Sequence, residues 1–102
     1  MLTLTYDAAG ARVPDEKAEA WARKQIDVYK KKPVGTNITL KIANGVVINA
    51  FRVLIKEGFI DNNDIQVNHD GFIYPIDPFG HILDWPPGFA EVEDNFLERL
   101  LF

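Results

Sequence analysis

The chain has 102 residues, 47% of them hydrophobic and 25% charged, which is the composition of an ordinary globular protein large enough for one hydrophobic core. We therefore expect residues 1–102 to form a single domain. A net charge of −4 argues against nucleic-acid binding, and the absence of cysteine excludes disulfides, thiolate catalysis and the usual structural zinc sites.

The N-terminal residues predict a strand. Polar and apolar residues alternate from Leu2 to Tyr6, as in a half-buried strand, and neither the basic leader nor the apolar core of a signal peptide is present. No apolar run in the chain approaches the roughly 20 residues that cross a bilayer. We therefore expect a cytoplasmic protein that is not bound to a membrane.

A hairpin and a helix are predicted next. Asp7 and Gly10 suit the first and last positions of a β-turn, so we expect a short hairpin arm through residues 11–13. Pro14, followed by two acidic residues, favours the start of a helix that ends before Pro33. The apolar face of this helix is formed by Ala18, Trp21, Ala22, Ile26 and Tyr29.

A second strand and a second helix follow. Strict alternation over residues 38–42 predicts the strand, and Asn44 can cap the helix after it. We expect this helix over residues 46–57, because Gly58 is a good residue for its C-terminal end. The β-branched residues 46–48 would also suit a strand, but the length of the apolar stretch favours a helix.

A hairpin and a last helix complete the chain. Residues 65–67 and 72–74 are predicted as its strands, joined by a turn at Asp70 and Gly71, and Pro75 favours an edge position. Further turns are expected at residues 61–64 and 77–80. The apolar face of the last helix is formed by Phe89, Val92, Phe96 and Leu100.

The predicted order is therefore strand, helix, strand, helix, strand, strand, helix. This order indicates the α/β (α+β) class, and we expect a small mixed sheet of about four to five strands with two or three packed helices. Strand order within the sheet does not follow from these patterns.

Common catalytic motifs are absent from the sequence. The chain has no serine or cysteine nucleophile and neither of the glycine-rich phosphate-binding motifs, so we expect no cofactor and no enzymatic activity. The alternative is a small metal-dependent enzyme that uses His69, Asp77, His81 and Asp84, since imidazole and carboxylate groups bind metals and transfer protons. Their spacing matches no known ligand pattern, and turns also explain the aspartates.

Residues 78–89 combine aromatic side chains with proline and glycine. Phe79, Trp85 and Phe89 cannot all lie on one face of a regular element, so some of them are expected at the surface, where they would bind a partner. The alternative is that Trp85 and Phe89 close the end of the core and hold the last helix.

The sequence also resembles a known family over roughly the last three fifths of the chain. Residues 42–58 and 73–89 are similar to the C-terminal end of predicted ABC-like P-loop ATPases, in which a switch strand, an Asn-x-x-Arg helix and a tail ending in Trp-Pro-x-Gly-Phe follow one another. The Trp-Pro tail is the most specific part. The phosphate loop and acidic strand of that family are missing, and Asn44 stands at the phosphate-sensing position without neighbouring hydroxyl groups.

This resemblance implies the structural end of an ATPase fold without ATPase activity. We expect a non-enzymatic accessory or protein-interaction domain that docks to a separately encoded ATPase or to another protein partner, or that self-associates. In this reading Asn49 and Arg52, on an otherwise apolar helix, would bridge to the partner; the alternative is that both simply face solvent.

Overall fold

The computed structural model describes residues 1–84, which form one mixed sheet of four strands with two α-helices. The strands are β1 (Leu2–Ala11), β2 (Ile38–Ile42), β3 (Ile65–His69) and β4 (Phe72–Pro75), in the order β2-β1-β3-β4. β1 is parallel to both β2 and β3, and β3 and β4 form an antiparallel hairpin. The helices are α1 (Ala18–Lys30) and α2 (Gly45–Lys56), with short 3-10 helices η1 (Asp15–Lys17) and η2 (Asn62–Asp64). The predicted class, a small mixed sheet with packed helices, is confirmed.

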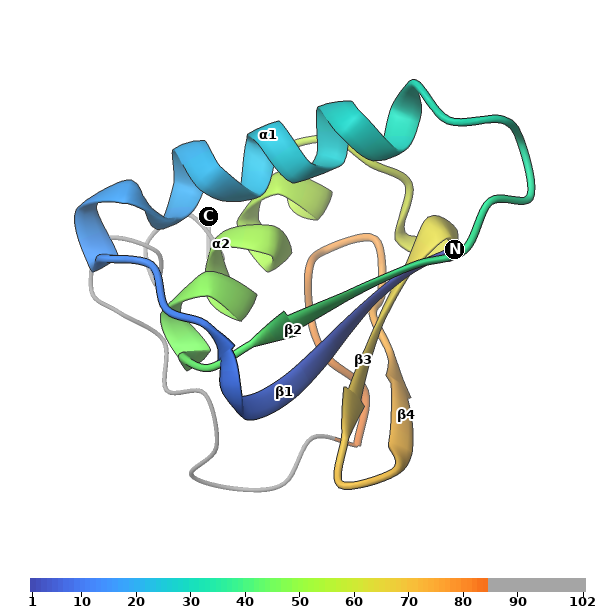
Figure 1. Ribbon diagram of the computed structural model, residues 1–102. Coiled ribbons are helices and arrows are strands. Elements are labelled where there is room, and N and C mark those ends of the chain that lie inside the picture. The colour runs from blue at the N-terminus through green and yellow to red at the C-terminus, as the bar shows by residue number, and fades with distance from the viewer. Residues whose placement is uncertain (85–102) are drawn as a thin grey trace.

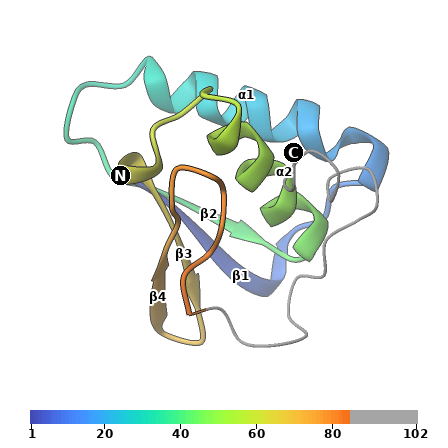
Figure 2. The same cartoon turned by 180° about the vertical axis from the view of Figure 1, so that it is seen from behind.

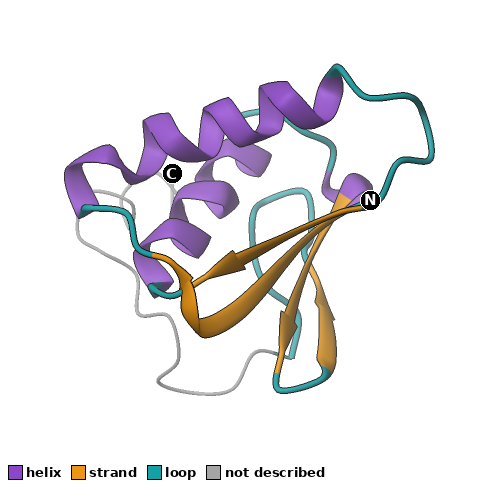
Figure 3. Cartoon of the chain, in the orientation of Figure 1, coloured by secondary structure: helices purple, strands orange, loops and turns teal. Residues whose placement is uncertain are grey.

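Both helices lie on the same side of the sheet (Figures 1 and 3). The burial of the strands follows this arrangement, because alternate side chains point to opposite faces. Leu2, Leu4 and Val67 are buried beneath the helices, whereas Thr3 and Thr5 on the other face remain partly exposed. No helix of residues 1–84 covers that second face (Figure 3).

The helix α2 lies between α1 and the sheet, as Figure 1 shows. Because it contacts neighbours on both sides, nearly all of its residues are buried, which explains an apolar composition that extends around the helix. α1 buries only one face, at Ala18, Ala22 and Ile26. The two helices meet through an edge-to-face contact of Trp21 with Phe51, whose ring centroids are 6.3 Å apart.

The hairpin predicted at residues 7–13 is wrong. β1 continues to Ala11, and after an irregularity at residues 7–10 the chain pairs with Ile42 a second time. Asp7 does bend the chain locally, because its Oδ1 accepts the Ala9 N–H at 2.9 Å. Gly10 serves close packing: a Cβ at this position would lie 2.5 Å from the carbonyl carbon of Lys41.

The residue Asn44 begins α2 as predicted, but its side chain does not cap the helix. Its Nδ2 donates to the Val13 carbonyl at 2.9 Å, and its Oδ1 accepts the Val13 N–H at 3.5 Å. The Ala43 N–H also donates to the Ala11 carbonyl at 2.9 Å. The segment before α1 is therefore fastened to the segment before α2.

The predicted hairpin of β3 and β4 is confirmed. Asp70 and Gly71 both have positive φ, 54° and 81°, which is the backbone that a two-residue hairpin turn requires. β4 is an edge strand, which agrees with the position of Pro75. Neither helix within residues 1–84 is long and apolar enough to cross a bilayer. The last predicted helix, together with Trp85 and Phe89, lies outside the described residues.

Candidate functional site

The loop after β4, residues 77–81, is closed by its own hydrogen bonds, and we call it the Phe79 loop. Asp77 Oδ1 accepts the N–H groups of Phe79 and His81, both at 2.9 Å. The Asp77 carbonyl accepts the Gly80 N–H at 3.0 Å, and the Asp77 N–H donates to the His81 carbonyl at 2.9 Å. The Asp-x-x-Gly turn predicted here is therefore present, with one carboxylate oxygen fixing two backbone groups.

The side chain of Arg52 joins this loop to α2. Its Nε donates to the carbonyl of Gly80 at 2.7 Å, and its Nη1 donates to Asn49 Oδ1 at 2.9 Å. Gly80 is buried, and among residues 1–84 Arg52 is the partner that its carbonyl has, so the bond satisfies a buried acceptor. Figure 2 brings the loop to the front, beside α2.

Burial also sets the electrostatics of Arg52. Removal from water lowers the pKa of Arg52 below its usual value, because a buried guanidinium loses hydration, and the negative charge of Asp77 opposes this effect. The guanidinium remains charged at neutral pH. The Asp77 carboxylate thus has two functions, since it folds the loop and supports the cation that holds it.

Of the predicted site residues, the structure brings Asn49 and Arg52 into contact, and Arg52 bonds Gly80, the residue after Phe79. Asn49 is fully buried, and Arg52 reaches the loop, so neither simply faces solvent as the alternative reading had it. Helical spacing indicates that Asn49 and Arg52 meet, being three residues apart. The acceptor at Gly80 was missed; the turn pattern in residues 77–80 was the only signal of an ordered loop there.

The exposed end of the loop carries Phe79 and His81. Phe79 is 62% exposed, and its ring centroid lies 6.4 Å from that of His81. His81 Nδ1 is 3.3 Å from Asp77 Oδ2, so the imidazole is also oriented by the loop. The loop therefore holds two rings side by side at the surface, on a backbone fixed from below.

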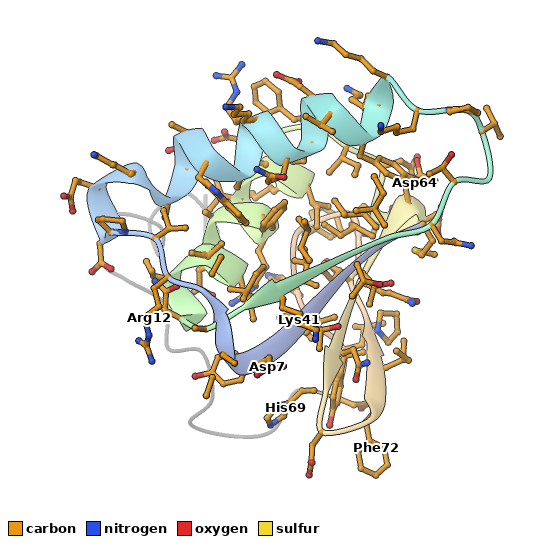
Figure 4. The ribbon with its side chains drawn as sticks, in the orientation of Figure 1. Asp7, Arg12, Lys41, Asp64, His69 and Phe72 are labelled. Atoms are coloured by element: carbon orange, nitrogen blue, oxygen red, sulfur yellow. The ribbon has the colours of Figure 1, made fainter. Side chains whose placement is uncertain are left out.

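The four candidate metal ligands do not form one cluster. Asp77 and His81 are in contact, but His69 lies at the end of β3, where its ring packs edge to face on Tyr6 with centroids 5.7 Å apart. Figure 4 places His69 beside Phe72, at the β3–β4 turn. Asp84 lies in a turn after the Phe79 loop, where its φ is positive, 58°. Within residues 1–84 no group of three His, Asp or Glu side chains could hold a metal ion.

Comparison with family models, with curated proteins and with solved structures gives no match. The similarity to ABC-like ATPases therefore stays a prediction. Asn44, at the phosphate-sensing position of that resemblance, uses its carboxamide to hold Val13.

Proposed function

We propose that the chain is a non-enzymatic protein-interaction domain that contacts its partner through the Phe79 loop. The observation that carries the proposal is a largely exposed aromatic side chain on a loop whose backbone is fixed by a partly buried arginine. A scattered exposed Phe is common on protein surfaces and needs no explanation. What distinguishes Phe79 is the set of hydrogen bonds that hold its backbone in one conformation.

The rigidity of the loop favours binding. Association costs free energy when flexible segments become ordered, so an aromatic residue on a prefixed loop loses less on binding than one on a mobile loop. Aromatic side chains are frequent among the residues that dominate interface energies. Gly80 and Arg52 would act from below as positioning residues, without touching the partner themselves.

The partner follows from the resemblance and from charge. A separately encoded ATPase of the resembled family is the first candidate, and a second copy of this chain is the other. An acidic chain of net charge −4 without cysteine suits a protein that acts on other proteins in the reducing cytoplasm, and it does not suit nucleic acid.

Phe79→Ala in the full chain tests this proposal, with Phe72→Ala as matched control. Phe72 is 67% exposed, at the far hairpin turn. Co-purification of the full chain with proteins encoded beside it identifies the partner. Isothermal titration calorimetry then measures the affinity of each variant for that partner. We expect it to be at least about tenfold weaker for Phe79→Ala and unchanged for Phe72→Ala. Sedimentation of the isolated chain measures self-association. Equal binding by both variants, each still folded, would contradict the proposal.

A metal-dependent enzyme has less support, because only Asp77 and His81 of its four residues are in contact. Titration of the chain with Zn²⁺ or Mg²⁺ in a calorimeter tests this alternative, which needs binding that His81→Ala abolishes.

A further inference from the structure

A second surface, separate from the Phe79 loop, surrounds a pocket of about 470 Å³ beside the start of α1. Residues 11–14 form one wall, and the helical residues Lys17, Ala20, Trp21 and Lys24 form the other. The spacing of these four residues places them on one face of the helix. Within the described part of the chain these two walls form an open groove, which a side chain can enter while its main chain continues past.

The walls of this groove are fixed. Val13 is held by one hydrogen bond donated by Asn44 and one accepted by it, and Ala11 is held by the bond from the Ala43 N–H to its carbonyl. On the other wall, Trp21 packs edge to face against the fully buried Phe51. A ligand would therefore meet a preformed indole surface, and binding would require little reordering.

The charged residues of the lining favour an acidic ligand. Among residues 1–84, the groove is lined by three cations, Arg12, Lys17 and Lys24, and by no acidic residue. Residues 12–32 contain seven of the eleven Lys and Arg residues of the chain but only four of its fifteen acids, in a protein whose net charge is −4. Figure 4 shows Arg12 at the end of this wall, with its side chain extending outward from the chain. Asp15, Glu16 and Glu19 belong to the same segment but do not line the pocket, so the positive charge that a ligand would meet is that of the three lining residues.

We propose that this groove binds an acidic polypeptide segment of a partner protein, with one large apolar side chain seated on Trp21. Lys17 and Lys24 are two helical turns apart, about 10 Å along the axis, so carboxylates on either side of the apolar residue would each face one ammonium group. A polypeptide fits better than a nucleic acid because most of the lining is apolar, and a nucleic acid requires a continuous row of phosphate contacts. The groove shares no residue with the Phe79 loop.

The fluorescence of Trp21 provides the measurement. In a full-length Trp85→Phe background, Trp21 is the remaining tryptophan, and the probe is the peptide acetyl-Glu-Glu-Phe-Glu-Glu-amide. Saturable quenching or a blue shift at submillimolar peptide is expected, with affinity falling as salt is added. The same titration is followed by calorimetry on the unmodified chain, so that the result does not depend on the Trp85 substitution.

Matched variants locate the binding. The double variant Lys17→Gln/Lys24→Gln should weaken peptide binding at least about tenfold, whereas Lys31→Gln/Lys32→Gln, which removes the same charge beyond the end of α1, should change it less than about twofold. Two changes to the peptide should each abolish binding: replacing its Phe by Ala, and replacing every Glu by Gln. Phe79→Ala should leave it unchanged, which separates this inference from the proposed function.

Three results would overturn the inference. They are the absence of saturable binding by both methods, equal weakening by the two lysine double variants, and tighter binding of an oligothymidylate than of the peptide.

Discussion

Arg52 donates its Nε hydrogen to the carbonyl oxygen of Gly80 at 2.7 Å, and this bond connects α2 with the loop that follows β4. The two residues are 28 positions apart in the chain. Arg52 also bonds Asn49, so the guanidinium joins a buried amide to a buried carbonyl. Phe79 precedes Gly80 in the chain and donates its N–H to Asp77 Oδ1, so its position depends on this contact.

Replacing Arg52 by Met should destabilise the protein by about 2 kcal/mol, because a charge-assisted hydrogen bond is lost and the buried Gly80 carbonyl is left without a partner. Urea unfolding measures the loss. Arg12→Met, which removes an exposed arginine, is the control and should change the free energy of unfolding by less than about 0.5 kcal/mol. Hydrogen exchange at the Phe79 and His81 amides should accelerate in Arg52→Met alone. Similar stability of the two variants would contradict the assigned contact.

Replacing Asn44 tests whether its side chain stabilises the protein through Val13 and not as a helix cap. An aspartate caps helices as well as an asparagine does, but it cannot donate to the Val13 carbonyl. We therefore expect Asn44→Asp to lose about 1 kcal/mol, close to the loss in Asn44→Ala. Thermal or urea unfolding of the three proteins measures this. A fully stable Asn44→Asp protein would mean that capping, and not the bonds to Val13, is what this residue contributes.

Gly10→Ala should destabilise the protein by about 1–3 kcal/mol, because its Cβ would meet backbone atoms of Lys41, which cannot move away as a flexible side chain can. Gly58→Ala is the comparison, since its φ of +85° strains any side chain although no atom lies within 4 Å. Both variants lose stability, but only Gly10→Ala should shift the amide resonances of Lys41 and Ile42. An unshifted Lys41 amide in Gly10→Ala would contradict the close approach.

Most of the fold was predictable because its signals are local. Alternation over residues 38–42, the apolar face of α1 and the Asp70–Gly71 turn depend on neighbours within one element, and the structure confirms each of them. The hairpin at residues 7–13 was predicted wrongly from an equally good local pattern. Gly10 is needed there because another strand passes close to it, and no local pattern contains that information.

The candidate site was predictable only in part. Helical periodicity places Asn49 beside Arg52, and the residues of the Phe79 loop specify their own turn. The contact between Arg52 and Gly80 depends on where the chain returns after β4, which periodicity does not specify. Trp21 was assigned to the core face of its helix, which agrees with its contact to Phe51, but its partial exposure in the groove was not foreseen.

The central position of β1 has a consequence for how the chain folds. Leu2 lies opposite both Ile38 and Ile65, so β1, which is synthesised before β2 and β3, acquires its second neighbour only after two helices have been synthesised. Parallel pairing between distant segments costs loop-closure entropy before any contact compensates for it. The rate-limiting step of folding should therefore be the arrival of β3 at β1, and until then one edge of β1 stays unpaired.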